Sequence, residues 1–110
     1  MAYDEALADR VRGVLARRRG VSEKKMFGGL SFLVNGHMAC GVVKDDLMVR
    51  VGPDAYDAAL EKKGSRAMDF TGRPMKGMVF VDPSGTKRAA TLKSWIEQGL
   101  AHARSLPPKG

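Results

Sequence analysis

The sequence predicts an α+β fold: a two-layer domain with the order α-β(3)-α-β(2)-α and one antiparallel sheet with helices on one face. Three observations predict this class. Asn35-Gly36 separates two runs of strand-forming residues, which is a strong hairpin signal. Apolar residues recur at helical spacing near both ends of the chain. The chain has 110 residues and one cysteine, so we expect a single domain over residues 1–110 without an internal disulfide.

Three helices are expected. The first covers residues 3–18, where apolar side chains recur every three or four residues until Gly20. The second is short and covers residues 53–63, because Pro53 fits the first turn of a helix. The third covers residues 86–104 and stops before two consecutive prolines.

Five strands are expected in two groups. The first group follows Gly28-Gly29, a pair that favours a bulge or a close backbone approach, and comprises the Asn35-Gly36 hairpin and residues 47–51, joined by a turn at Asp45-Asp46. The second group comprises a brief extended segment at residues 68–70 and a strand at residues 78–81. Residues 22–25 are polar and are expected to form a connection, which ends in a short extended piece at residues 26–27 before the glycine pair.

The two-residue hairpin loop fixes a register in which Val34 faces His37 and Phe32 faces Ala39. In that register the helix-facing side contains Leu33, Met38, Cys40, Val42, Val49 and Val51. The other side is also largely apolar, and three helices on one face leave none to cover it. The sequence therefore predicts a homodimer with this second side as its interface: Leu30, Phe32, Val34, His37, Ala39, Val43 and Met48.

The formal net charge of +7 raises the possibility of nucleic-acid binding, but the basic residues are spread along the sequence. The first helix has the pattern of a solvated amphipathic helix, so direct nucleic-acid binding is not expected. No apolar run is long enough to span a membrane and no secretory signal is visible, so we expect a cytoplasmic protein.

The titratable residues do not predict catalysis. His37 and His102 lie outside any metal-ligand spacing, and the aspartates belong to turns and helix starts. Cys40 lies in the middle of a strand, where a buried and unreactive thiol is the ordinary outcome. We therefore expect no metal, no cofactor and no enzymatic activity.

The most suggestive charged position is Arg50, a cation within an otherwise apolar strand. A covered guanidinium needs a carboxylate or ligand partner, and Asp69 could supply one. Arg50, Arg73 and Lys76 could together form a rim that binds a phosphate or carboxylate. The alternative is that Arg50 reaches solvent or pairs with an acid for structural reasons alone.

Several motifs, in this order, resemble the N-terminal domain of the TfoX/Sxy family of bacterial competence regulators. They are residues 26–30 (MFGGL), 36–42 (GHMACGV), 47–50 (LMVR), 68–77 (MDFTGRPMKG) and 80–81 (FV). The resemblance implies the same order of elements. It also implies a regulatory role through protein contacts, because the competence regulators act as coactivators with the cyclic-AMP receptor protein. Full-length members carry a second, C-terminal domain, so this chain resembles a stand-alone copy.

These observations favour a small non-enzymatic regulatory domain that acts in transcription through protein–protein contacts. Two alternatives stay open. One is an anion-binding protein or enzyme that uses the rim of Arg50, Arg73 and Lys76, and the other is direct binding of nucleic acid through basic residues.

Overall fold

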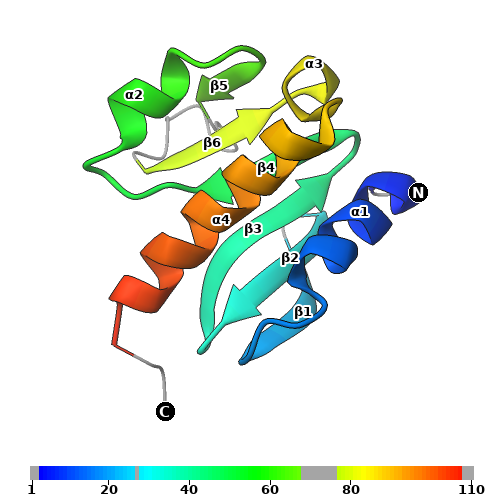
Figure 1. Cartoon of the computed structure of the whole chain (residues 1–110), viewed down its shortest axis with the longest axis vertical. Coiled ribbons are helices and arrows are strands. Elements are labelled where there is room, and N and C mark those ends of the chain that lie inside the picture. Colours follow the sequence, from blue (N-terminus) through cyan, green and yellow to red (C-terminus); the bar gives the residue numbers. More distant parts are fainter. Residues whose placement is uncertain (1–2, 27, 68–76, 108–110) are drawn as a thin grey trace.

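A computed structural model describes residues 3–26, 28–67 and 77–107 of the chain (Figure 1). Its elements are α1 (Glu5–Leu15), β1 (Val21–Met26), β2 (Gly29–Val34), β3 (His37–Val43), β4 (Asp46–Arg50), α2 (Tyr56–Leu60), β5 (Ser65–Ala67), β6 (Met78–Val81), α3 (Pro83–Thr86) and α4 (Ala89–Ser105). The described strands form one antiparallel sheet in the order β1-β2-β3-β4-β6-β5. Helices pack on one face, with α4 lying across β3 and β4 (Figure 1). The predicted α+β class is confirmed.

Two of the described helices, α1 and α3, begin where an aspartate side chain satisfies their first amide groups. Asp4 accepts hydrogen bonds from the backbone N–H groups of Ala6 and Leu7, at 2.8 and 3.2 Å, and so caps α1. Asp82 accepts from the N–H of Ser84 at 2.9 Å and caps α3, a short helix in a segment that the sequence predicts as a turn. None of the helices in the described part of the chain is long and apolar enough to cross a membrane.

The Asn35-Gly36 hairpin forms as predicted at its turn and then departs from the prediction. Val34 pairs with His37 and Leu33 with Met38, but Phe32 pairs with Cys40 because Ala39 is an extra residue in β3. This β-bulge shifts every later pair by one residue. A one-residue shift moves the side chains of β2 to the opposite face of the sheet from the one predicted.

The second hairpin is also shifted in register, but its side chains stay on the predicted faces of the sheet. Val43 pairs with Asp46, so the loop is Lys44-Asp45 rather than Asp45-Asp46, and Lys44 has a positive φ of 54°. Val42 therefore faces Leu47 instead of Val49. Because the partner changes by two residues, the faces stay as predicted.

A strand that the sequence does not predict, β1, forms one edge of the sheet by pairing with β2. Its charged residues are exposed, which discourages pairing with another sheet edge. Arg12 of α1 donates two hydrogen bonds to the Glu23 carboxylate of β1, each 3.0 Å, and so ties the strand to the helix. It donates a third hydrogen bond within α1, to Asp9 at 2.8 Å. These carboxylates raise the pKa of Arg12 above its ordinary value. Gly29, the first residue of β2, lies against the backbone of Val42, which confirms the predicted close approach.

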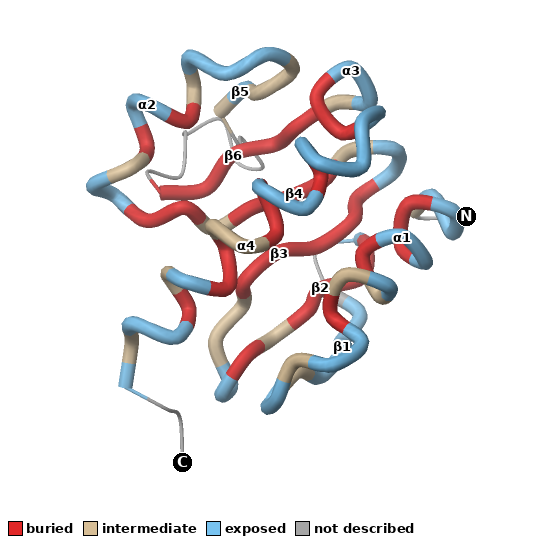
Figure 2. Tube along the Cα trace, in the orientation of Figure 1, coloured by how far each residue is buried: buried red, intermediate tan, exposed pale blue. Residues whose placement is uncertain are grey.

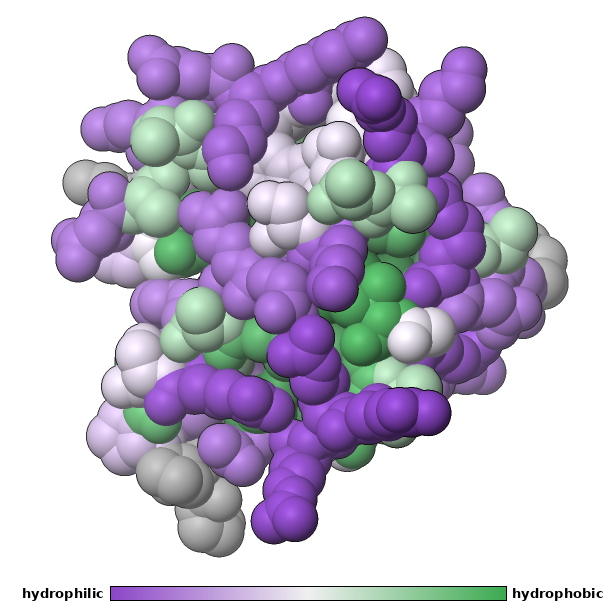
Figure 3. Space-filling view, in the orientation of Figure 1, coloured by the Kyte–Doolittle hydropathy of each residue, from purple (hydrophilic) through white to green (hydrophobic). Residues whose placement is uncertain are grey.

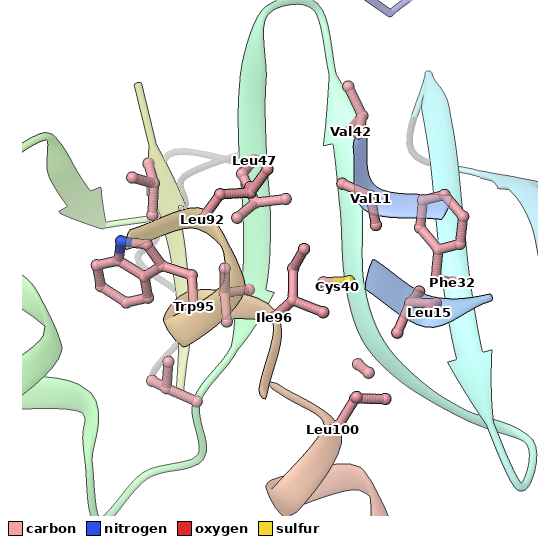
Figure 4. Packing of buried hydrophobic residues seen from close by; sticks show 14 of the residues in the cluster. Val11, Leu15, Phe32, Cys40, Val42, Leu47, Leu92, Trp95, Ile96 and Leu100 are labelled. Carbon is pink, nitrogen blue, oxygen red and sulfur yellow. The ribbon is translucent and has the colours of Figure 1, made fainter. Parts of the chain in front are cut away.

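The main core lies between the sheet and the helices, and most residues of β2, β3, β4 and β6 are buried, whereas α4 is buried along one side (Figure 2). Cys40, Val42, Val49 and Val51 belong to this core as predicted. In Figure 4, Phe32 of β2 lies beside Val11 and Leu15 of α1. The helix residues expected in the core are Leu7, Leu92, Ile96 and Leu100, all buried, with Val14 half-buried against them.

The other face of the sheet carries a smaller buried cluster of Val43, Met48, Met78 and Phe80, with Met38 packed against it. The predicted assignment was correct for Val43 and Met48. Leu30, Phe32, Val34 and Ala39 were predicted on this face but belong to the helix-side core. Met38 was predicted in that core but packs against this second cluster. Both errors have the same cause, because the bulge at Ala39 reverses the faces of the hairpin. Leu33, expected in the core, is half-buried.

The last two described strands, β5 and β6, pair with each other through Ala67 and Val79, among other pairs. The extended segment predicted at residues 68–70 lies outside the described residues. Trp95 of α4 is buried, and the Lys62 ammonium lies 4.9 Å from the centre of its ring, so the segment that follows α2 contacts α4.

Candidate functional site

The first candidate is the predicted rim around Arg50. Arg50 is half-exposed at the end of β4 and forms no ion pair with any residue that the structure describes. Its expected partner Asp69 and the other rim cations, Arg73 and Lys76, lie outside the described residues. The chain re-enters the described part at Gly77, whose carbonyl accepts hydrogen bonds from the N–H groups of Val51 and Gly52 at 2.9 and 3.0 Å.

Arg50 shares one corner of the molecule with several titratable groups. His102 of α4 packs on Gly52, where an added Cβ would lie 2.5 Å from its Nδ1 atom. Burial lowers the pKa of His102, the positive charges of Arg50 and His37 lower it further, and the Asp54 carboxylate opposes this effect. The lowered pKa favours the neutral form of His102.

The residues predicted as a dimer interface do not form an exposed patch. Leu30, Phe32, Val34 and Ala39 are 4 % exposed or less in the helix-side core, while Val43 and Met48 are buried in the second cluster. His37 is half-exposed beside the hairpin turn, and its Nε2 atom lies 2.5 Å from the carbonyl oxygen of Pro107. The homodimer stays a prediction, and most residues of its predicted interface are buried within the single chain.

Two kinds of reactive site can be checked in the described residues, a nucleophilic thiol and a metal centre. The Cys40 thiol is fully buried, and burial raises its pKa to about 12, so it stays protonated at neutral pH and is a poor nucleophile. No group of three or more histidine, cysteine, aspartate or glutamate side chains in the described ranges is arranged to hold a metal ion.

A groove lies between α1 and α4, and we call it the α1–α4 groove. It has a volume of about 400 Å³ and is lined by Arg10, Gly13, Val14, Arg18, Ala89, Leu92 and Lys93. Figure 3 shows apolar surface between the two helices, flanked by hydrophilic side chains. Gly13 leaves the groove open, because an added Cβ would meet nothing within 4 Å.

The rim of the α1–α4 groove is positively charged. Arg10 donates hydrogen bonds to the carbonyl oxygens of Thr86 and Lys87, at 2.8 and 3.3 Å, so its charge is fixed in place without being neutralised. Arg18 is paired with Glu97 at 2.5 Å, and Lys93 is exposed. An apolar floor below two uncompensated cations suits a protein segment that combines an apolar side chain with carboxylates.

A family model identifies the domain. The model of the TfoX N-terminal domain matches residues 14–103, which is most of the chain. The chain belongs to the TfoX N-terminal domain family. The resemblance seen in the sequence motifs is thereby confirmed, and this TfoX N-terminal domain is a member of a family of regulatory domains. Comparisons with curated proteins and with solved structures found no match.

The sequence contained a signal for the α1–α4 groove that its periodicity did not reveal. Gly13 lies within the first helix, next to the apolar residue Val14 and with Arg10 one turn before it. A glycine inside a helix costs stability and calls for a packing or functional reason. The second helix of the groove, α4, starts 76 residues after Gly13, so only the fold brings Leu92 and Lys93 to the surface that Gly13 shares.

Proposed function

We propose that this TfoX N-terminal domain is a non-enzymatic bacterial regulatory domain that acts in the cytoplasm, in transcription, through protein–protein contacts. The observation that carries the proposal is the α1–α4 groove, an open surface with an apolar floor and a cationic rim. Family membership supports the regulatory role, because the competence regulators that this domain resembles act as coactivators with another protein. The buried Cys40 thiol supports a function without nucleophilic catalysis.

The chemistry of the groove defines the partner. Arg10 and Lys93 attract carboxylates, and the space above Gly13 admits an apolar side chain between them. The partner segment therefore carries an apolar residue flanked by aspartate or glutamate. Charges at the rim mainly speed association and set the orientation, whereas the apolar contact at the centre supplies affinity.

The test is calorimetric titration of the domain with purified cyclic-AMP receptor protein, the partner that the family resemblance implies. We expect binding by the wild type and at least about tenfold weaker binding by Gly13→Glu, because the new side chain fills the groove and neutralises its rim. Glutamate forms helices well, so the substitution leaves α1 intact.

The matched control is Ala101→Glu, which makes the same charge change at an exposed position of α4 outside the groove lining. It should bind within about twofold of the wild type, since it leaves the contact surface unchanged. A wild type that does not bind the receptor protein contradicts the partner. Equal weakening by Gly13→Glu and Ala101→Glu contradicts the groove as the contact surface.

A further inference from the structure

Three consecutive arginines and a fourth from the end of the last helix surround a second hollow, which we call the arginine hollow. It has a volume of about 360 Å³ and is lined by Arg17, Arg18, Arg19, Asn35 and Arg104. Its sides come from the residues after α1, the β2–β3 turn and the last turn of α4. Figure 1 shows the β2–β3 turn and the C-terminal end of α4 at the same end of the molecule.

Hydrogen bonds between the three segments hold the hollow in shape. The N–H of Asn35 donates to the carbonyl of Gly20 at 3.2 Å, and Arg104 donates to the carbonyl of Arg19 at 3.4 Å. Gly20 has a φ of 76°, and an added Cβ there would lie 2.8 Å from Oδ1 of Asn35. The backbone that carries the arginines is therefore tied to the hairpin and cannot be moved apart without breaking these contacts.

The charges in the hollow are largely uncompensated. Arg18 is paired with Glu97, but Arg17, Arg19 and Arg104 form no ion pair with any described residue, and all three are exposed. A cation near the last turn of each helix is explained by the helix dipole. That effect accounts for Arg104 in the last turn of α4, and it does not explain Arg17 and Arg19, which follow α1 and line the same hollow.

The residue types in the hollow identify the anion. Guanidinium groups bind phosphate through paired hydrogen bonds, which lysine cannot reproduce. Pockets for small molecules are mostly apolar and enclosed, whereas this hollow has exposed walls and no apolar lining residue. Single-stranded nucleic acids are bound by aromatic stacking together with cations, and none of the described residues that line the hollow is aromatic. These features fit the closely spaced phosphates of a duplex.

We propose that the arginine hollow binds the phosphodiester backbone of double-stranded DNA, through Arg17, Arg19 and Arg104 and without reading the base sequence. This site is separate from the α1–α4 groove: the two share Arg18, whose charge is already neutralised by Glu97. The proposal differs from the expectation drawn from the sequence, in which the basic residues are dispersed. The fold gathers them.

The test is fluorescence anisotropy of a labelled duplex of about 20 base pairs, titrated with the wild-type domain between 50 and 200 mM salt. Three phosphate contacts predict a loss of about 40-fold in affinity over this fourfold increase in salt, since each contact contributes about −0.9 to the log–log slope. The triple variant Arg17→Gln, Arg19→Gln, Arg104→Gln should lose binding at 50 mM salt. Its circular dichroism and thermal melting establish that it is folded.

The matched control is Lys24→Gln, Lys25→Gln, Lys63→Gln, three exposed positions outside the hollow. Both triple variants lower the net charge by three, from +7 to +4. The control should retain the wild-type affinity within about threefold, because three distant charges add little at 0.1 M salt. An equal loss in both variants would show an effect of net charge and overturn the site.

Two further outcomes overturn the proposal. One is single-stranded DNA of the same sequence binding as tightly as the duplex. The other is inorganic pyrophosphate or ATP binding where the duplex does not, which would assign the hollow to a small phosphate compound. The arginine variant is also titrated with the cyclic-AMP receptor protein. Retained binding there separates failure of this proposal from failure of the proposed function, because none of the three arginines lines the α1–α4 groove.

Discussion

Gly99 is expected to be required for the docking of α4 on the sheet, and Gly99→Ala should destabilise the domain. The glycine lies inside a 17-residue helix, where alanine is normally better by about 1 kcal/mol. An added Cβ would collide with the carbonyl oxygen of Ala39 and lie 3.1 Å from its carbonyl carbon. Both obstacles are backbone atoms of the bulge in β3, which cannot rotate away.

The magnitude follows from that geometry. Ordinary contact requires at least 3.4 Å, so α4 must withdraw from β3 by about 1 Å, and a gap of that size forfeits a quarter to a half of each van der Waals contact. Overpacking of this kind costs about 1–3 kcal/mol. Because the obstacle is rigid, we expect about 3 kcal/mol, and the gain in helix propensity reduces the net loss to about 2 kcal/mol.

Gly13→Ala is the matched control, since it makes the same chemical change in a helix at a position with nothing within 4 Å. It should stabilise the domain by about 1 kcal/mol. In thermal unfolding followed by circular dichroism, we expect Gly99→Ala to lower Tm by about 8 °C and Gly13→Ala to raise it by about 4 °C. A Gly99→Ala protein as stable as the wild type would refute the close packing of α4 on the bulge.

Three other predictions follow from the buried and charged residues. The Cys40 thiol has a pKa of about 12 in the folded protein against 9.0 for the free thiol, so it releases its proton more readily in the unfolded chain. The free energy of unfolding should therefore fall by about 1.4 kcal/mol per pH unit between pH 9 and the folded pKa. In urea unfolding, Cys40→Ala should lack this part of the pH dependence. The pKa of His102 in the folded protein lies below 6.5, so its contribution to stability is present above pH 6.5 and is lost as the pH falls towards that lowered pKa. Arg50→Gln should raise the pKa of His102 in an NMR titration, because it removes a nearby positive charge. An unchanged pKa would show that Arg50 does not act on His102. Phe32→Glu should abolish cooperative unfolding because it buries a charge in the core, where Leu100→Ala should cost about 2–5 kcal/mol. A Phe32→Glu protein that is folded and monomeric in sedimentation equilibrium, beside a dimeric wild type, would contradict this expectation and support the predicted dimer interface.

The sequence predicted the fold class because its strongest signals are local. Asn35-Gly36 fixed the first hairpin, and both residues have positive φ, as a tight two-residue loop requires. The bulge at Ala39 could not be predicted, since an alanine in a strand carries no sign of an extra residue. That single residue changed the faces of Leu30, Phe32 and Val34 and removed the predicted exposed patch.

The edge strand β1 was missed for a different reason. Its residues 22–25 are polar and show no alternation, because an edge strand with exposed side chains does not need an apolar face. The strand is held instead by pairing with β2 and by the Arg12–Glu23 interaction, and neither contact is visible in a periodicity analysis.

The surfaces proposed for function were the least predictable part of the molecule. The distribution of charge along the sequence does not relate Arg17 to Arg104, although both line one hollow in the folded chain. The same holds for Gly13 and Lys93 in the α1–α4 groove. Contacts between residues about 80 positions apart depend on the topology of the sheet, which local patterns do not determine.

The most direct test of the proposed function is an NMR map of the domain labelled with ¹⁵N and titrated with unlabelled cyclic-AMP receptor protein. We expect the shifted backbone amides to cluster on the facing sides of α1 and α4, with Gly13, Val14 and Lys93 among the most affected. Shifts confined to the Arg50 and His102 corner or to the sheet face of Met48 and Phe80, or no shifts at all, would contradict the α1–α4 groove as the surface through which this TfoX N-terminal domain acts.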